Sequence, residues 1–224
     1  MKTKLLPLCL LIYVSCSRLE VVDPHIELSN NVLKPTVVFD TKEEGDVFVE
    51  YWRADGSRKR QTSMASHGTV HRITLLNLKP VTPYKYVVVN TTSGRTSREF
   101  DFTTGELFSD VPVAMTKVKI DTTQLKGYIL FRGWAPSGCD VLIDSEGDVV
   151  WYHQYDNMVR RPFAWTSNHT VLSMYDTAQI VEYDLYGNQK LNLKLEDRGI
   201  DNLLHHDLVY DKAGQIVTLT HDST

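Results

Sequence analysis

Residues 144–152 read DSEGDVVWY, and this stretch decides the fold because it recurs as DLYGNQKLN at residues 184–192. Each copy places an Asp-x-x-Gly turn between two strand-like runs, which is the pattern of a β-hairpin. The glycines of the two copies lie 40 residues apart. A different hairpin, FAWTSNHTVLSM at residues 163–174, lies between them and matches LVYDKAGQIVTL at residues 208–219, 45 positions later.

Two hairpin types that alternate every 40 to 45 residues predict the four-stranded blades of a β-propeller. The alternative is a second ordinary sandwich with coincidentally similar hairpins, because only two copies of each type are visible. We assign residues 107–224 to this region, a length that holds about two to three blades at roughly 40–45 residues each. We therefore expect an incomplete propeller with open blade edges, through which copies of the chain can associate.

The region before these hairpins, residues 22–106, predicts a β-sandwich domain. Short runs of alternating apolar residues, rich in β-branched and aromatic side chains and separated by turn residues, indicate antiparallel strands. These runs lie at residues 36–39, 47–52, 70–75, 84–89 and 98–103. Residues 17 to about 25 are expected to form a short tether. The sequence thus predicts an all-β chain, a sandwich followed by a partial propeller.

A turn inside this region indicates the type of sandwich. Residues 78–84 read LKPVTPY and resemble the L-x-P-x-T-x-Y corner of fibronectin type III domains, which are immunoglobulin-like sandwiches. A tyrosine at that corner can return its hydroxyl to the backbone a few residues upstream. The resemblance predicts a fold, and it says little about function.

The N-terminus predicts export. Two lysines within residues 1–4 precede an apolar stretch at residues 5–14, which is too short to span a bilayer as a mature helix. Residues 14–16 read VSC and resemble a bacterial lipobox, which implies a signal peptide at residues 1–15 and a lipidated Cys16 in the periplasm or at the outer membrane. The alternative is an ordinary signal peptide cut near Ser17. Cys139 then remains as the third cysteine, and we expect it to be buried.

Charge and motifs exclude several functional classes. The formal net charge of −4 and the pI near 6.0 give no basic surface for nucleic acid. The sequence contains no phosphate-binding P-loop, no G-x-S-x-G nucleophile motif and no G-x-G-x-x-G dinucleotide motif. We therefore expect no nucleic-acid partner and no cofactor.

The order of these features is similar to that of the bacterial arylsulfate sulfotransferases. The resemblance is carried by RGW at residues 132–134, by the run at residues 141–152, and by HHD at residues 205–207. It implies a periplasmic or lipid-anchored six-bladed propeller that moves a sulfuryl group from an aryl sulfate to a phenol without a nucleotide sulfate donor. It also implies that a histidine is transiently sulfated, and that other histidines and an arginine around the central channel stabilise the charged group.

The candidate site residues are His205 and His206. Imidazole is a nitrogen nucleophile when neutral and a two-donor cation when protonated, and it therefore suits sulfuryl transfer. Because successive side chains of a strand face opposite ways, we expect His205 to line the channel as a sulfate or phenol ligand and His206 to pack away from it. Asp207 is expected either to fix an imidazole tautomer or to cap the turn.

Other polar residues are weaker candidates for the channel, and for the arginines among them the alternative is a solvated or sandwich-bridging role. We expect a surface position for His67 and His71 of the sandwich, and adjacent strand positions argue against a metal site made of His205, His206 and His221. The weaker channel candidates are Arg132, His153, Arg160 and Arg161. His221-Asp222 has no predicted geometry.

Three hypotheses about function follow. The first is the N-terminal portion of an arylsulfate sulfotransferase-like enzyme, truncated before the nucleophilic histidine that the resemblance places on a later blade, and inactive alone. The second is a lipid-anchored surface protein that binds a glycan or a protein without catalysis. The third is a complete small enzyme of an unrelated type.

Overall fold

The computed structural model describes residues 18–63, 67–108, 111, 126–133, 138–155 and 163–221. The secondary structure of these residues consists of β-strands and one short 3-10 helix, η1 (Glu196–Arg198). No helix in the described ranges has the length and apolar character needed to cross a membrane. The prediction of an all-β chain is confirmed.

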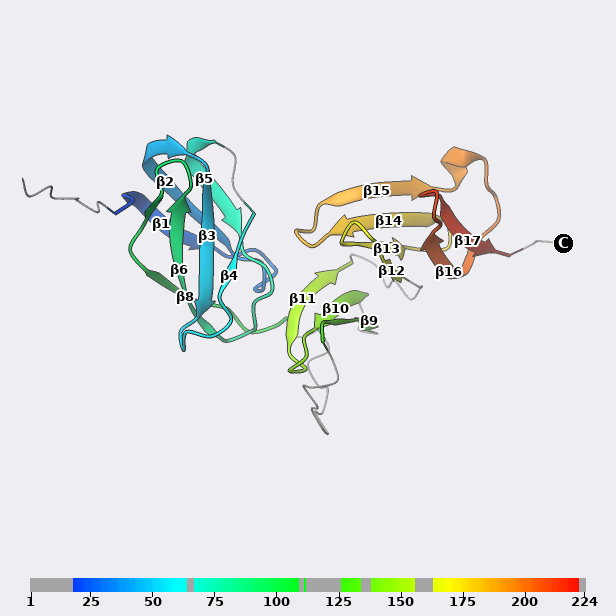
Figure 1. Cartoon of the computed structure of the whole chain (residues 1–224). Helices are drawn as coiled ribbons and strands as arrows, with labels where there is room; N and C mark the ends of the chain where they lie inside the picture. Colours follow the sequence, from blue (N-terminus) through cyan, green and yellow to red (C-terminus); the bar gives the residue numbers. More distant parts are fainter. Residues whose placement is uncertain are drawn as a thin grey trace, which may run out of the picture.

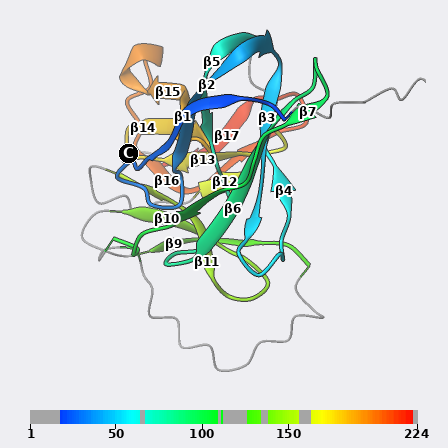
Figure 2. The same cartoon turned by 90° about the vertical axis from the view of Figure 1, so that its left-hand side faces the viewer.

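The N-terminal strands form two antiparallel sheets, one with the order β1-β2-β5 and one with the order β4-β3-β6-β7, in which β8 also pairs with β6 (Figures 1 and 2). Side chains that alternate along these strands, such as Val37 and Phe39 of β2 and Val47 and Val49 of β3, are buried between the sheets. This is the predicted sandwich. Its strands are β1 (Val21–Glu27), β2 (Thr36–Gly45), β3 (Val47–Arg53), β4 (Arg60–Gln61), β5 (Gly68–Thr74), β6 (Pro83–Asn90), β7 (Arg95–Thr96) and β8 (Phe100–Thr103).

The predicted tether is wrong over most of its described length, because residues 21–27 form strand β1 on the edge of the first sheet. The sequence signal is obscured by Pro24, which cannot donate to a ladder, and by Asp23, which has a positive φ of 50°. Both fall at a register shift between Val22 and His25, where the strand accommodates them as a bulge.

The tyrosine corner has the predicted geometry. The backbone N–H of Lys79 donates to the hydroxyl oxygen of Tyr84 at 2.9 Å, and Tyr84 is buried. The bond ties the start of β6 to the turn before it, which fixes where the chain enters the β4-β3-β6-β7 sheet of the sandwich.

The C-terminal strands form three separate antiparallel sheets that follow one another like blades (Figure 1). The second has four strands, as a propeller blade requires, and none of the described sheets closes on itself. The two predicted hairpin repeats correspond to β10–β11 with β14–β15, and to β12–β13 with β16–β17. The strands are β9 (Ile129–Gly133), β10 (Cys139–Ile143), β11 (Val149–Gln154), β12 (Phe163–Trp165), β13 (Thr170–Met174), β14 (Gln179–Asp184), β15 (Gln189–Lys194), β16 (Leu204–Tyr210) and β17 (Ile216–Thr220).

The four hairpin turns share one geometry. Each begins with a residue whose side-chain oxygen accepts the backbone N–H four residues later, at 3.1 Å for Asp144, 3.4 Å for Thr166, 2.9 Å for Asp184 and 2.8 Å for Asp211. The backbone N–H of the fourth turn residue donates to the carbonyl oxygen of the first in every case. That fourth residue has a positive φ, and it is glycine in three of the turns and His169 in the other. The repeat in the sequence is therefore a repeat of turn chemistry.

The sheets are joined by shared apolar cores. Side chains of the first blade-like sheet, including Cys139 and Tyr152, belong to the same buried cluster as the sandwich core. Tyr152 also accepts the backbone N–H of Val32 at 3.2 Å through its hydroxyl. Leu142 and Val171 belong to a cluster that joins the first sheet to the second. The burial expected for Cys139 is confirmed.

Candidate functional site

The candidate site lies at the start of β16, the first strand of the two-stranded β16-β17 sheet. The backbone N–H of Leu204 donates to the carbonyl oxygen of Thr177, in the turn between β13 and β14, at 2.8 Å. Leu204 and Leu208 are buried in the core that joins β16 to the second sheet. The end of β16 that carries the histidines is therefore anchored by backbone pairing and by apolar packing.

Three imidazole rings come together at this end. The ring centroids of His205 and His206 lie 3.6 Å apart, and those of His205 and His221 lie 4.0 Å apart. His205 is half-buried, whereas His206 and His221 are exposed. His221 arrives from the end of β17, where its backbone N–H donates to the carbonyl oxygen of Leu203 at 2.9 Å.

The prediction that His206 packs away from His205 is wrong. The ladder between β16 and β17 shifts register between His205 and Leu208, and His206 has a positive φ of 60°. This bulge breaks the alternation of an extended strand, so both adjacent rings lie on one side. Asp207 stabilises the bulge, since its carboxylate accepts the backbone N–H of Leu208 at 3.0 Å and its carbonyl accepts the Thr218 hydroxyl at 2.8 Å.

The arrangement offers several ring nitrogens to one small ligand. Neutral imidazoles each present one donor and one acceptor, and protonated imidazoles present two donors and a positive charge. A cluster of this kind can hold the oxygens of a sulfate ester and can pass a proton to a leaving oxygen. Sequence reasoning found His205 and His206, but it gave His221 no geometry because the pairing of β16 with β17 was needed to place it.

Arg132 has a structural role. Its guanidinium makes a bidentate ion pair with Asp140, with Nε at 2.6 Å and Nη2 at 2.8 Å from the carboxylate oxygens. Nη2 also donates to the hydroxyl of Ser173 in β13 at 2.7 Å, and Asp140 is fully buried. Arg132 therefore joins the first blade to the second. Burial, reinforced by the charge of Asp140, raises the pKa of Tyr155, whose hydroxyl donates to that carboxylate at 2.6 Å.

His153 lies among aromatic side chains. Its ring centroid is 4.3 Å from that of Tyr183 and 4.7 Å from that of Tyr155, and its ring stacks on Trp151 at 6.2 Å. These contacts place His153 between the first and second sheets rather than with the histidines of β16.

Of the sandwich histidines, His67 is exposed as expected, and the surface position expected for His71 is wrong. His71 is 2% exposed, its ring stacks on Phe39 with centroids 5.1 Å apart, and Nε2 lies 3.2 Å from the hydroxyl of Thr41. Burial lowers the pKa of His71.

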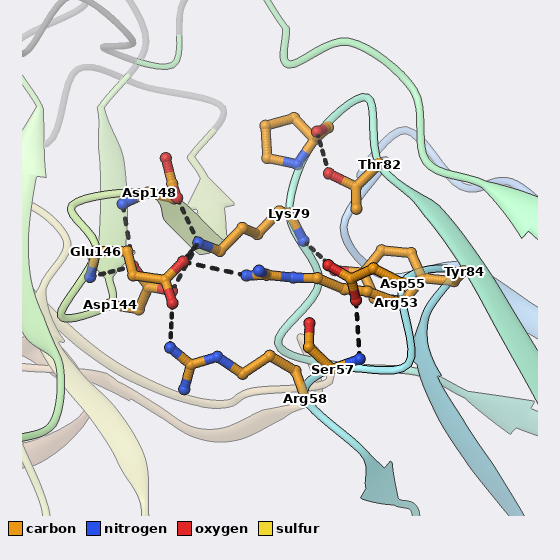
Figure 3. Close-up of polar contacts among 11 residues, drawn as sticks. Arg53, Asp55, Ser57, Arg58, Lys79, Thr82, Tyr84, Asp144, Glu146 and Asp148 are labelled. Carbon is orange, nitrogen blue, oxygen red and sulfur yellow. Dashed lines mark hydrogen bonds and ion pairs between the residues drawn. The ribbon is translucent and has the colours of Figure 1, made fainter.

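A carboxylate cluster that sequence reasoning missed lies between the sandwich and the first sheet. Within the described ranges, Asp144, Glu146 and Asp148 have carboxylate oxygens within 4.8 Å of one another, a spacing that a metal ion could use. The ammonium group of Lys79 already occupies this position. It contacts Glu146 and Asp148 and lies 3.2 Å from Asp144 (Figure 3). Arg53 also reaches Glu146, at 3.3 Å.

The cluster is an interdomain ion network. Hydrogen bonds from Lys79 and Arg58 lower the pKa of Glu146 to about 2. Burial lowers the pKa of Lys79, but hydrogen bonds to Asp148, Glu146 and Asp144 outweigh it and raise that pKa above its usual value. The sequence contains a signal for this network: among the four related hairpin turns, only this one has acidic residues at the positions of Glu146 and Asp148.

The described residues do not include Cys16, Arg160, Arg161, Asp222 or the signal peptide. The domain limits at residues 22–106 and 107–224 stay a prediction.

Comparisons with known proteins give two family matches. A family model described as "Arylsulfotransferase (ASST)" matches residues 85–224, and one described as "Purple acid Phosphatase, N-terminal domain" matches residues 22–104. No curated protein matches the chain.

Among solved structures, the chain is similar to a β-glucuronidase from Ruminococcus gnavus, with 13% identity over 55% of this chain and 17% of that chain, and a TM-score of 0.25. It is also similar to a protein of unknown function from Bacteroides caccae, with 8% identity over 78% of this chain and 65% of that chain, and a TM-score of 0.32. The chain thus covers less than two thirds of the length of either structure.

Proposed function

Because the chain belongs to the arylsulfotransferase (ASST) family, we propose that it takes part in the transfer of a sulfuryl group from an aryl sulfate to a phenol. The observation that carries the proposal is the cluster of three imidazoles at the start of β16. His205 is the principal ligand of the sulfate oxygens, because it is half-buried between the other two rings. His206 and His221 complete the donor set from the solvent side.

The proposed reaction has two steps. A neutral imidazole nitrogen attacks the sulfur of the aryl sulfate, an N–S bond forms, the aryl S–O bond breaks and the phenolate leaves with a proton taken from a neighbouring imidazolium. The oxygen of a second phenol then attacks the same sulfur, which breaks the N–S bond and restores the nucleophilic imidazole, and the proton of this phenol passes to the neighbouring imidazole. The developing negative charge is carried by the sulfuryl oxygens and the leaving oxygen, so fixed donors around them lower the barrier.

We place the nucleophilic imidazole on a blade other than the ones described, and we assign anion binding and proton transfer to His205, His206 and His221. The open form of the described sheets supports this arrangement, since a channel needs a wall opposite β16. On this proposal the described sheets by themselves have little transferase activity.

The second candidate is a surface protein without catalysis that binds other molecules through β16 and β17. The observation in its favour is the exposure of apolar side chains there, including Val209, Val217 and Leu219, which are 46%, 49% and 56% exposed. We also propose that copies of the chain associate with one another through the open edges of β16 and β17.

Location is a further proposal. We propose that the chain is exported to the bacterial envelope and anchored to a membrane by a lipid on Cys16. Expression with a palmitate analogue should label the wild-type protein and leave Cys16→Ser unlabelled. Equal labelling of both would reject the anchor.

The catalytic proposal is tested with 2-naphthyl sulfate. We expect the purified chain to bind it in equilibrium dialysis, and His205→Ala to bind about 10 to 100 times more weakly, the loss of one hydrogen bond to a charged group. His67→Ala, which removes an exposed histidine of the sandwich, is the matched control and should leave the affinity unchanged. Equal affinity in wild type and His205→Ala would refute the assignment. Robust transfer to an added phenol would refute the need for further blades.

A further inference from the structure

A cavity of about 690 Å³ lies between the sandwich and the first two blade-like sheets. Its lining includes Leu76 and Asn77 of the sandwich, Tyr128 before β9, and His169 in the turn between β12 and β13. His169 precedes β13, whereas the histidines of β16 lie beside the turn that follows β13. The cavity is therefore at the opposite end of the blades from the candidate site.

The walls of this cavity are apolar and aromatic. Trp151 is held in place because its indole N–H donates to the carbonyl oxygen of Leu185 at 2.7 Å. Trp165 is 44% exposed, and its ring centroid lies 6.1 Å from that of His169. Among the described residues that line the cavity, none is Asp, Glu, Lys or Arg. A volume of roughly 300–1,000 Å³ with such walls is typical of sites for small molecules.

One end of the cavity has unused hydrogen-bonding capacity. The Asn77 side-chain amide donates to the hydroxyl of Tyr128, and the Asn77 Oδ1 is buried without a hydrogen-bond partner. A buried acceptor without a donor destabilises the protein, and such groups are rare. A ligand hydroxyl at this end can satisfy Oδ1 after a small rotation of the carboxamide, and can also bond to Tyr128.

Two lining residues have backbone conformations that residues other than glycine rarely adopt. Asn77 has a φ of 60° and His169 has a φ of 59°. At the position of His169, the three equivalent turns have Gly147, Gly187 and Gly214. Two of these turns contribute lining residues: the turn with Leu185 keeps Gly187, whereas the turn with His169 has a histidine where glycine is favoured, which indicates that the side chain of His169 is needed there.

We propose that this cavity binds a neutral phenol, with its ring between the aromatic walls near Trp165 and His169 and its hydroxyl at Asn77 and Tyr128. A phenol matches the cavity in two ways. Its flat apolar ring suits the apolar and aromatic walls, and its hydroxyl can donate to Asn77 Oδ1. An aryl sulfate does not fit, because its charge would be buried away from any lysine or arginine of the described lining. The choice of a phenol over other neutral aromatic donors rests in part on the proposed function, whose acceptor and product are phenols.

The test uses 2-naphthol and 2-naphthyl sulfate at pH 7 with the full chain. We expect 2-naphthol to bind the wild-type protein, and Asn77→Gly, which suits the same φ, to bind it about tenfold more weakly. Asp23→Gly is the matched control, since Asp23 has a φ of 50° on exposed β1. Trp165→Ala, at an exposed position, is the second variant and should also weaken binding. Thermal unfolding checks that each variant folds.

The two sites give opposite patterns. His205→Ala should lose affinity for 2-naphthyl sulfate and keep its affinity for 2-naphthol, and Asn77→Gly should do the reverse. Failure of the first pattern alone rejects the proposed function, while failure of the second alone rejects the cavity. Absence of 2-naphthol binding to the wild type, or equal binding by wild type, Asn77→Gly and Trp165→Ala, overturns the inference.

Discussion

Replacing Lys79 by methionine is expected to destabilise the chain by about 3 kcal/mol at pH 7. The side chains of Lys79 and Asp144 are both 11% exposed, so their ion pair is shielded from water. Without the ammonium group, Asp144, Glu146 and Asp148 remain within 4.8 Å of one another. At an effective dielectric constant of about 20, two like charges at that separation repel by about 3 kcal/mol. Breaking a buried pair costs about 3–5 kcal/mol, and we take the lower end because Arg53 and Arg58 still neutralise Glu146.

The assay is urea unfolding at pH 7 followed by circular dichroism, with Lys85→Met as the matched control. Lys85 pairs with Glu99 at 3.0 Å, but these side chains are 35% and 55% exposed, so the control should cost less than about 1 kcal/mol. Equal losses in the two variants would refute the claim that the network joins the sandwich to the first sheet.

The same network predicts an acid-sensitive stability. The pKa of Glu146 is about 2 in the folded chain and near 4.5 without its partners. Because the folded pKa is the lower one, this contribution is present above about pH 4.5 and is lost as the pH falls towards 2. The shift corresponds to about 3 kcal/mol, which screening of the partly exposed group reduces to about 1–2 kcal/mol. The loss between pH 4.5 and 2 should be smaller in Lys79→Met, since Lys79 is the largest cause of the shift.

Two further changes test the turns. Tyr84→Phe removes the buried bond to the backbone N–H of Lys79 and should cost about 1–2 kcal/mol in urea unfolding, whereas Tyr186→Phe, at an exposed position, should cost almost nothing. His169→Gly should raise the melting temperature, because glycine relieves about 1 kcal/mol of strain at a φ of 59°, and Gly214→Ala should lower it. A lower melting temperature for His169→Gly would mean that contacts of the ring outweigh the strain.

Much of the fold could be predicted because its signals are local. The strands alternate apolar and polar side chains, and the four hairpin turns each begin with a side-chain oxygen that fixes the turn by itself. The tyrosine corner is equally local, since Tyr84 bonds to a residue five positions earlier. Strand β1 was missed because its pairing with β2 overrides the unfavourable Asp23-Pro24 pair, and an isolated sequence does not reveal that partner.

The candidate site was predicted less well because it depends on contacts between distant residues. The rule of alternating faces fails at His206, where the bulge is stabilised by Asp207 and by the hydroxyl of Thr218 from the paired strand. The sequence left Arg132 as a channel, solvated or sandwich-bridging residue, because it does not show that the buried carboxylate of Asp140 lies beside it. His71 was expected at the surface because a single polar residue in a strand does not show which face is buried.

The packing explains why the two proposed sites should respond independently to mutation. The sandwich and the first blade-like sheet, which contribute most of the cavity lining, share one apolar core and the ion network of Lys79. The histidine cluster instead depends on β16 and β17, a two-stranded sheet whose contact with the second sheet is a small core around Leu204 and Leu208. Two strands alone are marginally stable, and Val217 and Leu219 are exposed. A further blade that packs against β16 and β17 should therefore strengthen sulfate binding by the histidine cluster. It should leave phenol binding in the cavity unchanged.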